Sequence, residues 1–325
     1  MYINKSTRTK MTIITAESIK HMNVDDVVSL IESSQYSLVD QIIDAMLELD
    51  MIITSFNDFK KILSCPIYYQ NRIKIVRKHI EYCDSVENII FLLNNFVSLQ
   101  RVEFVKICKN KIKKIDDLQK ILLNIDCKYQ RFEVIKIFDF IGITYPDILK
   151  LVNLIGDEYY KRKTIKYFRN YIDVITTIKL INESGVESIY NIFHVDNFDE
   201  STNIITKLNN NVHKKQLITQ YEELFDGQNI FKYLELLTNF SDQFEFIKYF
   251  YKKIVIENLF ENPLELLKCV NGVTEQDDKN RQKLLEFIVK KMYVVLDTKC
   301  LNYFVTEQVR VELISDLVRS GTIKI

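Results

Sequence analysis

A six-residue pattern recurs along this 325-residue chain, with most copies 29 or 30 residues apart and two longer steps of 53 and 38 residues. The clearest copies are RIKIVR at 72–77, RVEFVK at 101–106, RFEVIK at 131–136, QFEFIK at 243–248 and RVELIS at 310–315. Weaker copies lie at 161–166, 214–219 and 281–286. A fixed period in this range is typical of proteins built from stacked supersecondary units. The period therefore predicts a repeat architecture.

The apolar residues of each copy recur at helical spacing. In RFEVIK, Phe132, Val134 and Ile135 lie on one apolar arc of a helix. Glu133 and Lys136 fall on the wetter side, three residues apart, where opposite charges weakly favour a helix. The chain also has only 6 Gly and 3 Pro for tight turns between strands. We therefore predict an all-α fold, a right-handed helix-pair repeat solenoid with repeats of about 30 residues.

The arginine that leads the copies is the unusual member of the pattern. At about 100° of rotation per residue, Arg131 projects near the middle of the apolar arc. A charge is tolerated there when its stem packs and its head group reaches a partner. We predict a structural role, binding carbonyl groups or a carboxylate at inter-helix turns, for Arg72, Arg101, Arg131, Arg281 and Arg310. A ladder of ligand-binding arginines is the alternative.

Spacing and composition divide the chain into five predicted segments. A 53-residue gap between two copies of the pattern indicates one degenerate repeat, which is also the candidate for a bend. The segments are a flexible tail at 1–11, an N-terminal helical cap at 12–59, regular basic helix-pair repeats at 60–172, the degenerate repeat at 173–212 and C-terminal helix pairs at 213–325.

The net charge is zero, but it is unevenly distributed along the chain. Residues 60–170 carry 22 basic and 12 acidic side chains, whereas the flanking parts each have an excess of five acidic ones. In a stacked array, the second helices of successive pairs lie side by side, about 8–10 Å apart. We predict that this alignment produces a basic stripe that binds a partner: Lys74, Arg77, Lys106, Lys109, Lys136, Lys163, Lys166 and Arg169.

Three interpretations of the basic stripe remain open. The first is a solvated face without a partner. The second is a surface for an acidic protein partner or for the acidic end of a second copy. The third is a site for nucleic acid or anionic membrane. A net charge of zero argues against a dedicated nucleic-acid-binding protein, because such a domain is usually strongly basic. Salt dependence separates these classes, since phosphate binding releases counterions.

No motif predicts catalysis, a cofactor or a metal site. The four histidines are far apart, the six cysteines contain no CxxC pair, and the glycines form no phosphate-binding loop. We expect free thiols in a reducing compartment, and the longest apolar runs are too short to span a bilayer. The sequence therefore predicts a protein that is not an enzyme, with no catalytic residues, no cofactor, no metal and no membrane span.

The helix pairs resemble the α-solenoids of the HEAT and tetratricopeptide kinds over about residues 55–320. The repeat is shorter than either kind and the tetratricopeptide pattern residues are missing, so no functional residue is carried over. The resemblance implies a scaffold that binds peptides, proteins or RNA on an extended face. We expect a cytoplasmic protein–protein interaction scaffold, with a nucleic-acid-binding solenoid as the alternative.

The amino-acid composition provides a second resemblance. The chain is rich in Ile and Asn and has no Trp. This composition resembles that of proteins from AT-rich genomes, including large DNA viruses. For a viral protein, the implied location is the host cytoplasm or the virion.

Overall fold

The computed structural model describes residues 13–49, 52–224, 229–256, 263–270, 274–292 and 298–320. Within these ranges every regular element is a helix, so the all-α prediction is confirmed for the described residues. The predicted flexible tail at 1–11 lies outside them. The chain divides into two compact units, Met1–Thr164 and Ile165–Ile325.

The first unit consists of short helices with brief connections. Its α-helices are α1 (Ala16–Ile19), α2 (Val24–Ser33), α3 (Tyr36–Glu48), α4 (Phe56–Ser64), α5 (Tyr69–Lys78), α6 (Val86–Leu93), α7 (Ser98–Cys108), α8 (Ile115–Leu123), α9 (Lys128–Ile137), α10 (Tyr145–Ile155) and α11 (Glu158–Phe168), the last of which runs on into the second unit. Single 3-10 turns follow α5 and α7: η1 (Ile80–Tyr82) and η2 (Lys109–Lys111).

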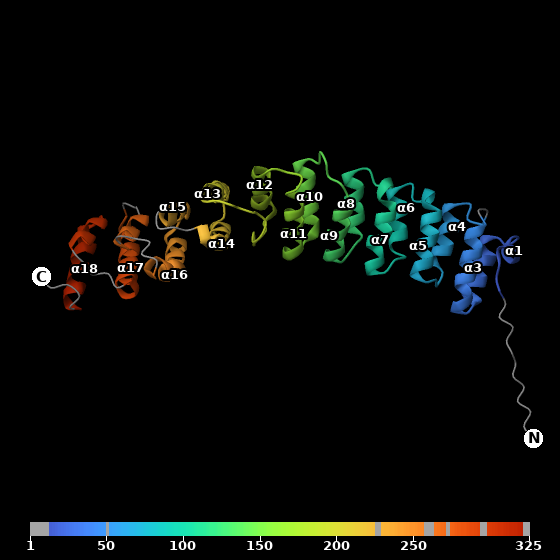
Figure 1. Ribbon diagram of the computed structural model, residues 1–325, viewed down its shortest axis with the longest axis horizontal. Helices are drawn as coiled ribbons and strands as arrows, with labels where there is room; N and C mark the ends of the chain where they lie inside the picture. The colour runs from blue at the N-terminus through green and yellow to red at the C-terminus, as the bar shows by residue number, and fades with distance from the viewer. Residues whose placement is uncertain are drawn as a thin grey trace, which may run out of the picture. The chain divides into compact units, whose positions relative to one another are not determined.

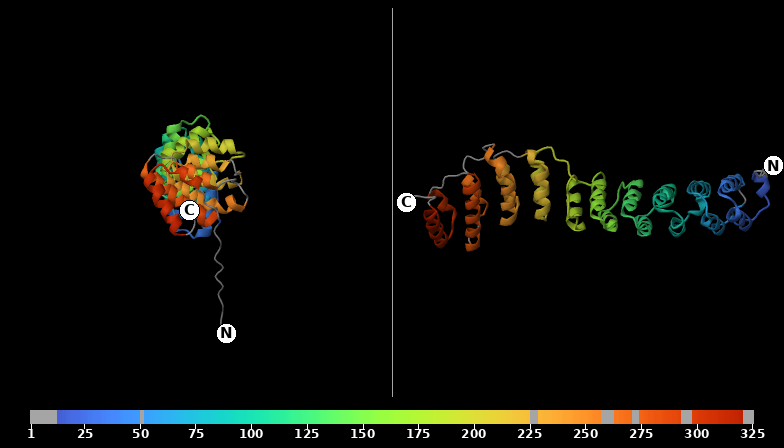
Figure 2. Two further views of the ribbon diagram at one scale, coloured as in Figure 1. Left: turned by 90° about the vertical axis from the view of Figure 1, so that its left-hand side faces the viewer. Right: turned by 90° about the horizontal axis from the view of Figure 1, so that it is seen from below.

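Contacts in the first unit connect alternate helices of the chain. On one side α2 contacts α4, α6 contacts α8, and α8 contacts α10. On the other side α3 contacts α5, α5 contacts α7, and α7 contacts α9. The unit therefore has a first layer made of the first helices of successive pairs and a second layer made of the second helices, as Figure 1 and Figure 2 illustrate.

Three first-layer helices begin at short polar capping residues, and the first-layer helices bury one apolar edge. The side chains of Asn23, Ser55 and Ser85 accept hydrogen bonds from backbone N–H groups in the first turns of α2, α4 and α6. Such N-caps satisfy donors that a helix start leaves free. Apolar residues at i, i+3 and i+4 then form the core-facing stripe, which comprises Phe59, Ile62 and Leu63 in α4, Ile89, Leu92 and Leu93 in α6, and Leu118, Ile121 and Leu122 in α8.

The second unit repeats the two-layer pattern. α13 contacts α15, and α15 contacts η4, while α14 contacts α16, α16 contacts α17, and α17 contacts α18. Its elements are α12 (Val174–Ser184), α13 (Phe198–Lys207), α14 (Asn211–Gln220), η3 (Glu222–Leu224), α15 (Asn229–Leu236), α16 (Phe240–Ile256), η4 (Pro263–Cys269), α17 (Glu275–Met292), η5 (Thr298–Tyr303) and α18 (Glu307–Arg319).

The segment predicted to hold a degenerate repeat, 173–212, lacks a helix between α12 and α13. Residues 185–197 form turns and irregular chain there. Gly185 ends α12 with a φ of 65°, and Asn191 has a φ of 62°. The left-handed backbone conformation is ordinary for Gly and uncommon for Asn. We refer to residues 186–195 as the irregular segment.

Side chains from flanking helices satisfy the backbone of the irregular segment. Gln216 accepts a hydrogen bond from the N–H of Ile189, and Gln220 accepts one from Asn191, both at 2.8 Å. Three other side chains form hydrogen bonds of 2.6–2.9 Å with backbone carbonyl oxygens of the segment. His213 contacts the carbonyl of Val186, Tyr221 that of Phe193, and Arg169 that of Ile192. Because buried backbone groups need partners, these side chains replace the internal hydrogen bonds of the helix that is absent from this segment.

Candidate functional site

The fourth residue of several second helices forms a bridge between helix pairs. Arg72, fourth in α5, donates a hydrogen bond of 3.1 Å to the carbonyl oxygen of Cys65, directly after α4. The same guanidinium donates to the carbonyl of Asn95, two residues beyond the end of α6. Since α6 opens the next pair, one side chain joins the ends of two successive first helices.

The same bridge recurs in the next two pairs. Arg101 donates to the carbonyl groups of Phe96 and Asn124, and Arg131 donates to those of Ile125 and Leu154. In all three bridges the second carbonyl lies 23 residues after the arginine. Lys214, fourth in α14, reaches the carbonyl of Leu236, 22 residues ahead.

Helix electrostatics explain why a cation occupies the apolar arc. The last carbonyl groups of a helix lack internal partners and form the negative end of the helix dipole. A cation between two such ends therefore satisfies both of them. Arg72, Arg101 and Arg131 are accordingly half-buried, with their head groups between the layers.

The other two predicted structural arginines contact carbonyl groups in a different arrangement. Arg310, fourth in α18, donates to the carbonyl of Phe304. Arg281 is seventh in α17, is only 4% exposed, and donates to the carbonyl of Val270. It also forms an ion pair of 3.0 Å with Asp278, whose carboxylate is completely buried.

Three members of the predicted basic stripe have carboxylate partners within the chain. They are Lys74 with Asp44 at 2.8 Å, Arg77 with Glu103 at 3.1 Å, and Lys136 with Glu133 at 3.3 Å. The cation of each pair is exposed, so each pair contributes little to stability. They do balance the local charge, which leaves fewer uncompensated cations than the sequence alone suggests.

The remaining members of the stripe have different surroundings. Among the described residues, Lys106, Lys109 and Lys166 have no carboxylate partner. Arg169 donates to the carbonyl of Ile192 at 2.9 Å and is half-buried. Lys163 and Lys166 belong to different units, so a continuous stripe over all eight residues stays a prediction.

A tyrosine–lysine cluster, formed by Tyr129, Tyr159, Tyr160 and Lys163, lies on α9 and α11 in the first unit. The ring centroid of Tyr160 is 5.8 Å from that of Tyr129 and 5.0 Å from that of Tyr159. The ammonium of Lys163 lies 4.4 Å from the Tyr159 centroid, a cation–π distance. Interaction with the Tyr159 side chain raises the pKa of Lys163, so the cluster is cationic at neutral pH.

Exposed apolar groups mark the N-terminal ends of the second helices throughout the first unit. Tyr36 and Tyr68, at the starts of α3 and α5, have ring centroids 5.5 Å apart. We call the set the N-terminal edge, and its members are Tyr36, Tyr68, Val97, Tyr129 and Tyr159, with exposures from 41% to 64%. The N-terminal edge is not among the sequence-based predictions, although Tyr129 and Tyr159 stand one repeat apart.

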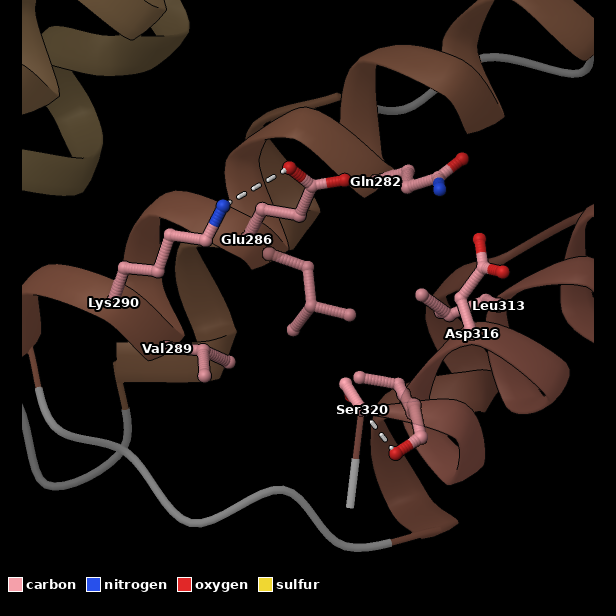
Figure 3. A pocket seen from close by; sticks show the side chains of 9 residues that line it. Gln282, Glu286, Val289, Lys290, Leu313, Asp316 and Ser320 are labelled. Atoms are coloured by element: carbon pink, nitrogen blue, oxygen red, sulfur yellow. Dashed lines mark hydrogen bonds and ion pairs between the residues drawn. The ribbon is translucent and has the colours of Figure 1, made fainter. Parts of the chain in front are cut away.

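A groove of about 340 Å³ lies between α17 and α18 in the second unit. Figure 3 shows residues of the two helices facing each other across it. Leu285, Val289, Leu313 and Leu317 contribute the apolar part of the lining. Glu286 pairs with Lys290 at 3.7 Å on one side, and Asp316 on the other side pairs with Arg319 at 3.6 Å. The charged groups of the lining are therefore paired within the chain.

The search for a metal centre covers the described part of the chain. No group of three or more His, Cys, Asp and Glu side chains among these residues is arranged to hold a metal ion. The six cysteines are free thiols. Within the same ranges, no helix combines the length and apolarity needed to cross a bilayer.

Comparison of the chain with known protein families, curated proteins and solved structures finds no match.

Proposed function

We propose that the chain is a right-handed helix-pair solenoid, with repeats of about 30 residues, that acts as a non-catalytic scaffold for protein–protein contacts. The bridge to a carbonyl 22 or 23 residues ahead carries this proposal. This hydrogen bond connects one helix pair to the next at almost the same sequence separation each time. Such regular contacts are expected in arrays whose units contact only their neighbours. Such arrays present long surfaces to their partners.

The N-terminal edge is the part of this surface that best suits a protein partner. Tyrosine is enriched at protein interfaces, because its ring covers a large area at a low cost in conformational entropy. Lys163 adds a cation beside Tyr159, and Lys106 is exposed on the same layer without a carboxylate partner in the described residues. We therefore expect an acidic partner, in the reducing cytoplasm where free cysteines persist.

Reversing three charges is expected to abolish partner binding while leaving the fold intact. In the triple variant Lys106→Glu, Lys163→Glu and Lys166→Glu, each changed residue is exposed. Exposed charges typically contribute about 0–1 kcal/mol to stability, so the thermal midpoint should stay nearly unchanged. Affinity capture from native lysate, with and without nuclease, measures binding, and circular dichroism measures melting.

A matched variant tests whether the position of the charges matters. Lys150, Lys179 and Lys207 are exposed on α10, α12 and α13, and their reversal changes the net charge equally. This control should retain a nuclease-resistant partner. Equal loss of the partner in both variants, or its retention by the first variant at high salt, would contradict the role of these lysines.

Nucleic-acid binding is a second candidate, and the tyrosine–lysine cluster favours it. Adjacent aromatic rings beside cations form the platforms on which unpaired bases stack. If this function holds, a 12-nucleotide oligouridylate should bind with an affinity that falls steeply with added salt. Tyr159→Ala should weaken binding roughly tenfold, because stacking one base contributes about 1–3 kcal/mol.

The control for that experiment is Tyr249→Ala. Tyr249 is 60% exposed on α16, outside the tyrosine–lysine cluster. Fluorescence anisotropy of the labelled oligonucleotide compares the three proteins. No binding by the wild type, or equal weakening by both substitutions, removes the second candidate.

A further inference from the structure

A pocket of about 430 Å³ lies in the second unit beside the irregular segment. Its walls come from the end of α11, from the irregular segment itself, and from the end of α14 with η3. An α-helix with its side chains is about 10–12 Å across, whereas a single irregular chain is narrower. The replacement of a helix by the irregular segment thus accounts for space at this point of the fold.

Two cations line this pocket. Lys166 lies in the last turn of α11, and Arg169 is the first residue after that helix. Arg169 is held in place, because it donates to the carbonyl of Ile192 at 2.9 Å and lies 5.6 Å from the ring centroid of Phe193. Its other N–H groups have no partner among the described residues, so they remain available to a ligand.

The other groups around the pocket leave an excess of permanent positive charge. Glu223 is the carboxylate in the lining. His194 also lines the pocket and lies 3.1 Å from Asp196, which is outside the lining. Burial raises the pKa of Tyr221, so its hydroxyl stays neutral at physiological pH and adds no negative charge.

We propose that this pocket binds a phosphate ester carried on a side chain of a partner protein. A phosphate ester carries a charge of about −1.5 to −2 at neutral pH, so it suits a pocket in which Lys166 and Arg169 outnumber the Glu223 carboxylate. The guanidinium fork also suits paired phosphate oxygens. The pocket is within the size range of organic ligand sites, and Phe193 and Val195, which are 3% and 5% exposed, supply an apolar wall for the carbon stem.

Phosphorylated peptides test this assignment directly on the full chain. Fluorescence anisotropy compares labelled hexapeptides containing phosphoserine or phosphotyrosine with the same peptides lacking phosphate. We expect at least one phosphorylated peptide to bind tenfold or more tightly than its unmodified form. Equal binding of the two forms, or no binding of either, overturns the proposal. Tighter binding of a 5′-phosphorylated oligonucleotide than of either peptide overturns the assignment to a protein partner.

Substitution of Lys166 locates the binding to the pocket. Lys166→Glu should weaken phosphopeptide binding about tenfold or more, because a hydrogen bond between charged groups is lost and a repulsion is added. Lys166 is exposed and makes no ion pair in the described residues, so its variant should fold normally. Lys207→Glu, an equal charge change on α13, should bind like the wild type. Equal effects of the two reversals overturn the proposal.

This readout is independent of the scaffold function. The peptides are small and defined, so they report on the pocket even when no partner is captured from lysate. Phosphopeptide selectivity in a wild type that captures no protein from lysate would support the pocket and count against the scaffold function. Capture of a protein without phosphopeptide selectivity would overturn the pocket alone.

Discussion

Asp278→Ala is expected to destabilise the second unit by about 3–5 kcal/mol, the usual cost of removing one partner from a buried ion pair. The carboxylate of Asp278 is completely buried. It accepts hydrogen bonds from the N–H groups of Val305 at 2.9 Å and Thr306 at 2.6 Å, and it pairs with Arg281 at 3.0 Å. Alanine would remove the buried carboxylate that pairs with the Arg281 guanidinium and accepts the two backbone N–H groups. Urea unfolding followed by circular dichroism measures the loss.

The same carboxylate should make the stability of the second unit dependent on pH. Burial alone would raise the pKa of Asp278, but hydrogen bonds from Val305, Thr306 and Arg281 outweigh it and lower the pKa below 3.8. A lowered folded-state pKa contributes stability that is present above the unfolded-state value and is lost as the pH falls through the folded value.

Asp278→Asn supplies the control for the pH dependence, because it keeps the shape of the side chain and removes its titration. Below about pH 4, the wild type should lose stability more steeply than this variant. Parallel pH profiles of the two proteins would show that Asp278 does not carry this part of the acid sensitivity.

Arg131→Ala is expected to destabilise the first unit by about 1–3 kcal/mol, the cost of leaving buried polar groups without partners. The substitution removes the donors to the carbonyl groups of Ile125 and Leu154, and so breaks the bridge between α8 and α10. Arg131→Lys should recover part of the loss, because one cation remains near the helix ends. Thermal and urea unfolding of the three proteins test this order.

Lys136→Ala is the matched control, since Lys136 is exposed five residues further along α9. Its midpoint should stay close to that of the wild type. If Arg131→Ala instead melts like the wild type and loses a bound partner, the arginines form a ligand-binding ladder and the structural interpretation is wrong.

The local features of this fold are readable in the sequence. Helical periodicity depends on residues three and four apart, which is why Leu118, Ile121 and Leu122 indicate the buried edge of α8. The position of Arg131 within an apolar arc likewise implies a partner inside the protein. Most copies of the pattern are 29 or 30 residues apart, which indicates stacked helix pairs. The first two inferences use only residues within a helical turn or two, and the third uses only a pattern repeated along the chain.

The identity of each partner was decided by the tertiary structure. Arg131 bonds to a carbonyl 23 residues ahead, and Lys74 pairs with Asp44, 30 residues before it. The ring of Tyr129 meets that of Tyr160 from the next pair. These contacts depend on how one helix pair packs against the next. The spacing of apolar residues within a single helix does not reveal how two pairs are aligned.

The irregular segment illustrates the same division. The 53-residue gap indicates that a repeat departs from the pattern, and it leaves open what replaces the missing helix. Gln216 and Gln220 look like ordinary surface residues of a helix until the fold places them against the backbone of Ile189 and Asn191. By itself the sequence determined an all-α chain of helix pairs with cations at their turns, because those features are local. Tertiary packing alone decided which groups those cations bind and where a pocket opens, because both depend on residues that meet only when successive pairs stack.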